Sequence, residues 1–172
     1  MENFYQSLGY LIFGSRLKRM SEYYLSEINA VYKNKDIEFD ASWFPVFYLL
    51  SKHQPISIQE LSETTMVSHS ASSQLITSLR KKGLLIAEKS KDDARKQQVR
   101  LTESGLQLLD KLIPVWDAIH QELDKKISED KASLPLLEVL TAAEVLMMKS
   151  SLSENIIERL NHNQQKDNPN EY

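Results

Sequence analysis

Between residues 68 and 77 the sequence gathers short side chains that donate and accept hydrogen bonds, with no acidic residue among them. Apolar residues recur four apart at Ala71, Leu75 and Leu79, which predicts a helix with an apolar inner face. Polar groups on such a helix suit base-pair edges in a DNA major groove, where glutamine can bond adenine twice. The candidate contacts are Ser68, His69, Ser70, Ser72, Ser73, Gln74 and Thr77. A solvated helix face with no ligand is the alternative interpretation.

A basic segment follows this helix. Two short β-compatible runs, Leu84–Lys89 and Gln97–Leu101, flank the charged residues 90–96, which predicts a hairpin. An arginine on a protruding loop suits the narrow, negative minor groove of A·T-rich DNA, and Asp93 can hold the Arg95 guanidinium in one orientation. The candidate contacts are Lys89, Lys91, Asp93, Arg95, Lys96 and Arg100. An exposed hairpin of mixed charge without a ligand is the alternative.

Local signals define the elements that position these residues. Ser57 and Glu60 form a capping box that begins a helix, because each side chain can satisfy a backbone N–H of the first turn. Ser68 is a second N-cap, and Gly83 suits the left-handed residue that ends a helix. Residues 57–105 therefore read as helix, turn, helix and hairpin, which is the layout of a winged helix-turn-helix.

Motifs in this segment resemble the MarR-type winged-helix transcriptional regulators. Asp93-Ala94-Arg95, followed by Val99-Arg100-Leu101-Thr102 and Gly105, is similar to the family's D-x-R wing running into L-T-x-x-G. Lys82-Gly83-Leu84 also lies where such proteins close their recognition helix. The ordered combination is specific, and the resemblance covers roughly residues 5–160.

The resemblance implies a homodimer that binds double-stranded DNA at an inverted-repeat operator. The Ser68–Lys82 helix would lie in the major groove, and Arg95 would reach the minor groove. Many relatives carry an arginine on the recognition helix where this chain has Gln74 or Thr77, so base preferences do not transfer.

Apolar stripes outside this segment predict helices that pair two copies of the chain. Residues 4–33 form one candidate helix, 102–127 a second with a kink at Pro114, and a third begins near Leu134 and restarts at Ser151. Pairing with the same helices of a second copy would place two recognition helices about 34 Å apart. An intramolecular bundle without a dimer is the alternative.

The predicted fold is mainly α with a small β-hairpin wing. We expect an N-terminal dimerisation helix at 1–36 and a winged helix-turn-helix DNA-binding domain at 37–105. C-terminal dimerisation helices follow at 106–160, and the polar residues 161–172 are expected to form a disordered tail.

A dense group of aromatic residues falls in a helix predicted at Ala41–His53, capped by Asp40. They either pack in the core and between domains or line an apolar pocket. The resemblance implies that such a pocket would bind a small lipophilic or aromatic effector. The candidate pocket residues are Tyr23, Tyr24, Trp43 and Phe47.

Charge is distributed unevenly along the chain. The net charge is −3, yet the segment from Lys52 to Arg100 holds nine Lys or Arg against five Asp or Glu, a net +4, which leaves −7 elsewhere. A basic segment within an acidic protein is typical of a DNA-binding surface.

Other classes of site find little support. Cysteine is absent, which excludes disulfides, thiolate metal sites and thiol redox sensing. The four histidines lack zinc-site spacing, and the sequence shows no nucleotide-binding or catalytic motif, so we expect no metal, no cofactor and no enzyme activity. The apolar residues 4–13 are too short for a membrane span and lack signal-peptide features, so we expect a cytoplasmic protein without membrane contact.

Three hypotheses remain: a dimeric DNA-binding regulator, usually a repressor relieved by an effector; a winged-helix adaptor that binds proteins and not DNA; and a small enzyme with an unrecognised site. The basic hairpin favours the first, because an adaptor has no need for Arg95, Lys96 and Arg100 around a loop.

Overall fold

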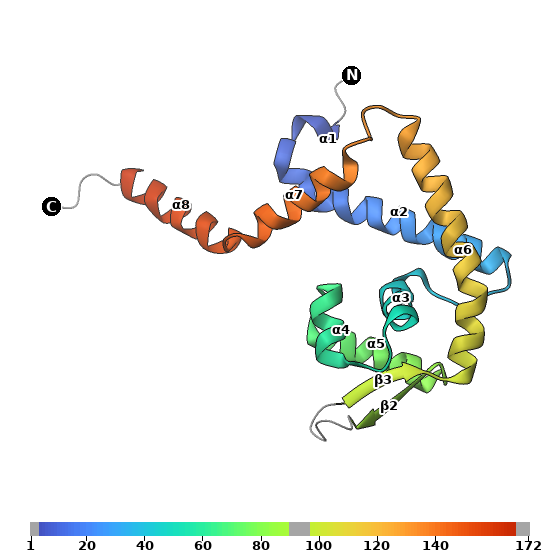
Figure 1. Ribbon diagram of the computed structural model, residues 1–172. Coiled ribbons are helices and arrows are strands. Elements are labelled where there is room, and N and C mark those ends of the chain that lie inside the picture. Colours follow the sequence, from blue (N-terminus) through green and yellow to red (C-terminus); the bar gives the residue numbers. More distant parts are fainter. Residues whose placement is uncertain (1–3, 90–96, 168–172) are drawn as a thin grey trace. The chain divides into compact units, whose positions relative to one another are not determined.

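The computed structural model describes residues 4–89 and 97–167 (Figure 1). The chain divides into two compact units, Met1–Asp117 and Ala118–Tyr172. The first holds the winged helix-turn-helix, and the second holds the last two helices. The predicted fold class, mainly helical with a small β wing, is confirmed.

Short helices precede the first long one: α1 spans Phe4–Ser7, η1 spans Gly9–Ile12, and α2 spans Phe13–Asn34. The single helix predicted over residues 4–33 is therefore wrong at its start. Gly9 has a φ of 52°, a left-handed conformation that ends a right-handed helix and that glycine adopts without a steric penalty. The apolar stripe expected on α2 includes Leu17, Met20 and Tyr24, which are exposed, and the buried residue of this helix is Tyr32.

The winged domain follows in the order expected. Its elements are η2 (Ala41–Trp43), α3 (Phe44–Lys52), β1 (Ile56–Ser57), α4 (Ile58–Thr65), α5 (His69–Lys81), β2 (Leu85–Lys89) and β3 (Gln97–Leu101). β2 and β3 form the predicted antiparallel hairpin, with Leu85 opposite Leu101 and Lys89 opposite Gln97. β1, which was not predicted, adds to the other side of β3. Two residues are too few to show a period in sequence.

One apolar core lies beneath these elements. Leu50 of α3, Leu61 of α4, Leu79 of α5 and Val99 of β3 are almost completely buried. Leu112 of α6, which spans Glu103–Ser128, joins the same core. The core therefore fixes α5 and the hairpin against α3, α4 and the first half of α6.

The second unit contains the remainder of α6, then α7 (Leu136–Met148) and α8 (Leu152–Asp167). The restart at Ser151 is confirmed, because its Oγ accepts a hydrogen bond from the Glu154 N–H at 3.3 Å. The disordered tail predicted from residue 161 is wrong up to Asp167, since α8 continues through these residues. Polar residues such as Asn and Gln extend a helix that apolar residues have already nucleated. Among the described residues, no helix combines the length and the apolar character that crossing a bilayer requires.

Candidate nucleic-acid interface

Two N-caps fix where α4 and α5 begin. Ser57 Oγ accepts a hydrogen bond from the Glu60 N–H at 3.0 Å, and Ser68 Oγ accepts one from the Ala71 N–H at 3.3 Å. Met66 takes a left-handed conformation after α4, and the Val67 N–H donates to the Ser62 carbonyl at 3.1 Å. The caps expected at Ser57 and Ser68 are thus present, one immediately before each helix.

The end of α5 is joined to the start of α6. Gly83 has a φ of 74°, its N–H bonds the Arg80 carbonyl at 2.9 Å, and the Leu84 N–H bonds the Leu79 carbonyl at 3.0 Å. This is a Schellman cap. Thr102 Oγ1 donates to the Gly83 carbonyl at 2.6 Å and accepts from the Gly105 N–H at 3.0 Å.

Gly105 allows this close approach of backbones. A Cβ at this position would lie 2.3 Å from the Leu84 carbonyl oxygen. The Thr and Gly of the L-T-x-x-G motif are therefore structural: they hold the first turn of α6 against the residues that end α5.

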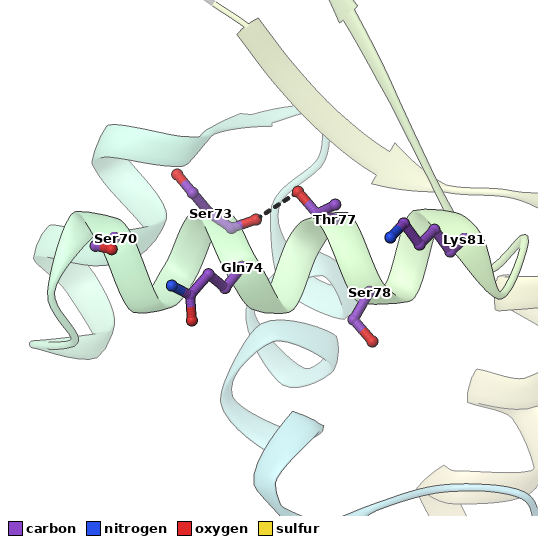
Figure 2. Close-up of a pocket in the computed structure, with 6 residues that line it drawn as sticks. All are labelled: Ser70, Ser73, Gln74, Thr77, Ser78 and Lys81. Carbon is purple, nitrogen blue, oxygen red and sulfur yellow. Dashed lines mark hydrogen bonds between the residues drawn. The ribbon is translucent and has the colours of Figure 1, made fainter.

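The outward face of α5 carries the polar row found in the sequence (Figure 2). A shallow hollow on this face is lined by Ser70, Ser73, Gln74, Thr77, Ser78 and Lys81. His69, Ser70, Gln74 and Thr77 are exposed, as is the cap Ser68. Within the described residues, no hydrogen bond occupies the Gln74 amide, so its donors and acceptor face solvent. Lys81 and Ser78 were missed by the sequence analysis, although they follow Gln74 and Thr77 at helical spacing.

Ser72 does not belong to this face, which corrects the sequence prediction. It is only 1% exposed, and its hydroxyl has no hydrogen-bond partner in the described structure. The buried residues of α5 are Ser72, Ile76 and Leu79, whereas Ala71 is exposed. Burying the Ile76 side chain removes more apolar surface from water than burying the Ala71 methyl, and Ser72 lies one turn before Ile76 on the same face.

The hairpin is described only in part. Lys89 ends β2 and is exposed, whereas Lys91, Asp93, Arg95 and Lys96 lie outside the described residues. Arg100, on β3, donates from Nη2 to Glu88 Oε1 at 2.8 Å across the hairpin, and both side chains are about half exposed. The sequence analysis missed this pairing, which the register of β2 and β3 makes possible.

Lys82 is a further residue that the sequence analysis did not select. Its Nζ lies 3.0 Å from Glu38 Oε1 and 5.4 Å from the centre of the Trp43 ring. Both partners lie on the segment that leads into α3. The residue after α5 therefore contacts this segment through charge and cation–π attraction.

The residues suggested for an effector pocket do not all come together. Phe47 is completely buried and packs edge-on against Phe39, so its place in a pocket is wrong and it belongs to the core. Trp43 is half-buried and also packs on Phe39, whereas Tyr23 and Tyr24 are exposed on α2. Within the described residues, no ring contact joins either tyrosine to Trp43.

A separate aromatic contact joins α2 to α6. The Trp116 Nε1–H donates to the Tyr32 hydroxyl oxygen at 3.0 Å. Burial raises the pKa of the Tyr32 hydroxyl, and the hydrogen bond from Trp116 opposes part of that shift. Neither residue was selected from the sequence for this role.

No group of three or more His, Asp or Glu side chains in the described part of the chain is placed to hold a metal ion.

Comparison with known proteins agrees with this geometry. Residues 38–96 match the model of the MarR family. The HTH-type transcriptional repressor IacR of Pseudomonas putida is 26% identical over 113 residues, which cover 62% of this chain and 68% of that protein. The S. aureus MepR–DNA complex has the same fold, with a TM-score of 0.66 at 17% identity over 78% of this chain and 98% of that one.

The PcaV transcriptional regulator of Streptomyces coelicolor, solved with its natural ligand, also has this fold, with a TM-score of 0.62 at 17% identity over 77% of this chain and 92% of that one. The matched residues 38–96 include the capped turn and all of α5, which present the open polar face. Over residues 38–96 the chain is therefore of the MarR type, the winged helix-turn-helix of DNA-binding transcriptional regulators.

Proposed function

We propose that this regulator is a homodimeric repressor that occupies an inverted-repeat operator on double-stranded DNA. The observation that carries the proposal is the outward face of α5, where Gln74 and its polar neighbours have no competing partner among the described residues. The relative IacR is named a repressor, and MepR was solved on DNA. A cytoplasmic location follows from this role.

The proposed dimer uses the helices on either side of the winged domain, 1–36 and 106–160, around a DNA-binding domain at 37–105. α7 has no buried residue although most of its side chains are apolar. Leu137, Val145 and Met148 are each more than 60% exposed. An apolar surface of this kind is typical of a protein–protein contact, and a second copy of the chain supplies a matching one.

The proposed DNA contacts fall into two sets. Ser68, His69, Ser70, Ser73, Gln74 and Thr77 of α5 would meet base edges and nearby phosphates, with Ser72 excluded. Lys89, Lys91, Arg95 and Lys96 would meet the backbone and the minor groove, with Asp93 orienting Arg95. Arg100 would have to exchange its contact with Glu88 for a phosphate.

A small apolar or aromatic effector is a further part of the proposal. PcaV has this fold and was solved in complex with its natural ligand, so a protein of this fold can bind a ligand. The candidate residues are now Tyr23, Tyr24 and Trp43, because Phe47 is core. An effector would act by favouring a spacing of the two recognition helices that does not match the operator.

A gel-mobility assay tests the central proposal. The full-length protein is mixed with DNA from upstream of its own gene, at two salt concentrations, with a random-sequence duplex of equal length as competitor. We expect retention that survives the competitor and falls steeply with salt, because phosphate contacts release counterions. Retention that the competitor abolishes at stoichiometric amounts would contradict sequence-specific binding.

Arg95→Ala separates the hairpin from α5. We expect this variant to bind every sequence more weakly and to show a shallower salt dependence, because the charge of Arg95 would be attracted to the phosphates and the negative minor groove of any duplex. Its control is Lys52→Ala on α3, outside both the proposed DNA contacts and the proposed dimerisation helices, which we expect to bind like the wild type. Unchanged affinity of Arg95→Ala would refute the role given to the hairpin.

A further inference from the structure

The hydroxyl of Thr77 is already bonded within α5. Thr77 Oγ1 donates to the backbone carbonyl of Ser73 at 2.8 Å, the bond drawn as a dashed line in Figure 2. A hydroxyl has one proton to donate, and here the helix uses it. Thr77 therefore has no donor left for a ligand, and it presents its methyl group together with the acceptor lone pairs of its oxygen.

Gln74 has the opposite character. Its side chain is exposed beside Thr77 on the same hollow, and no hydrogen bond within the described residues occupies its amide. An amide offers a carbonyl acceptor and an NH₂ donor together, which matches the N6 donor and N7 acceptor of adenine.

The charge of this face is also informative. Ser70, Ser73, Gln74, Thr77 and Ser78 are neutral, and Lys81 lies only at the last turn of α5. Arginine or lysine bound to guanine is the commonest specific contact in a major groove. The central part of α5 lacks the side chain that would select guanine.

We propose that α5 selects two neighbouring A·T base pairs: Gln74 bonds the adenine of one pair, and the Thr77 methyl packs on the thymine methyl of the next. Three residues advance a helix by about 4.5 Å along its axis, close to the spacing of about 3.4 Å between base pairs. The inference rests on the proposed function, since it assigns base identities within the same operator.

Selection from a random duplex library tests the adenine contact. Full-length protein is used to enrich bound sequences, in parallel with Gln74→Ala and with Gln59→Ala, an exposed glutamine on α4, as the matched control. We expect two adjacent A·T pairs in each half-site of the wild type and of Gln59→Ala. Gln74→Ala should lose the preference at one of these positions, with affinity for the best wild-type sequence reduced about tenfold.

Deoxyuridine tests the thymine contact, because it removes only the methyl group from the base. In the selected duplex, replacing the thymine at the second position with deoxyuridine should weaken wild-type binding about fourfold. This is the change in affinity expected from the loss of one buried methyl group. Thr77→Val keeps the methyl, so it should respond to deoxyuridine like the wild type. Thr77→Ser keeps the hydroxyl and loses the methyl, so it should bind both duplexes equally.

The outcomes separate this inference from the proposed function. If no sequence is enriched, both fail. If a sequence is enriched but holds G·C pairs at the positions that depend on Gln74, or if Thr77→Ser discriminates thymine from deoxyuridine as the wild type does, the DNA-binding proposal stands and this assignment is wrong.

Discussion

The winged domain and α7 contain similar apolar residues but bury them to very different extents. In the winged domain Phe47, Leu50, Leu79 and Val99 are all completely buried. In α7 no residue is buried, and Leu137 is 71% exposed. The first set of side chains is covered within its own compact unit, whereas the second set is open in its unit. This difference supports the proposal that the apolar surface of α7 contacts a second copy of the chain.

The largest expected effect comes from placing charge on α7. We predict that the double variant Leu137→Glu, Val145→Glu is monomeric and loses at least about a hundredfold in DNA affinity. In the dimer each glutamate would lose its hydration without gaining a partner, which costs free energy. Two-fold symmetry places the same substitutions in both copies, so the cost is doubled. Light scattering gives the mass, and gel mobility gives the affinity.

The matched control is Leu137→Met, Val145→Ile, which keeps both positions apolar and should remain dimeric. A glutamate variant that keeps the mass and DNA affinity of the wild type would show that α7 does not hold two copies together.

Phe47→Ala tests the winged domain, whose apolar residues are buried. We expect it to lower the free energy of unfolding by about 3 to 5 kcal/mol, because it removes a completely buried ring and leaves a cavity. Urea unfolding followed by circular dichroism measures this change. Phe44→Ala is the control, since Phe44 is partly exposed and should cost clearly less. Equal losses from the two variants would contradict the burial difference.

Gly105→Ala tests the joint between α5 and α6. A Cβ placed 2.3 Å from the Leu84 carbonyl oxygen forces a backbone shift, and we expect a loss of about 1 to 3 kcal/mol in unfolding free energy. DNA affinity measured on the folded variant should fall further than stability alone explains, because α5 ends at this joint. Gly14→Ala, where a Cβ meets nothing within 4 Å, is the control.

The parts of the fold that depend on neighbouring residues were predicted well from the sequence. The caps at Ser57 and Ser68, the stop at Gly83 and the hairpin strands each depend on a few adjacent residues, and each lies where it was expected. The polar face of α5 followed from the same periodicity, with Gln74 and Thr77 placed correctly on the outside.

The errors arise where tertiary packing decides. Which residues of α5 face inward depends on the shape of the core, so Ser72 and Ala71 were exchanged. The contact between Arg100 and Glu88 needs the strand register, and the contacts of Lys82 join residues far apart in sequence. Patterns within one element carry no information about such pairings.

Ser72→Ala should produce the smallest effect and tests the corrected inner face directly. The Ser72 hydroxyl is buried without a partner, so removing it should leave the unfolding free energy unchanged or raise it by up to about 1 kcal/mol. DNA affinity should stay at the wild-type value, whereas Ser70→Ala, on the open face, should weaken binding. Loss of affinity in Ser72→Ala without loss of stability would mean that this hydroxyl reaches DNA. Ser72 would then belong to the open face of α5 and not to its buried face.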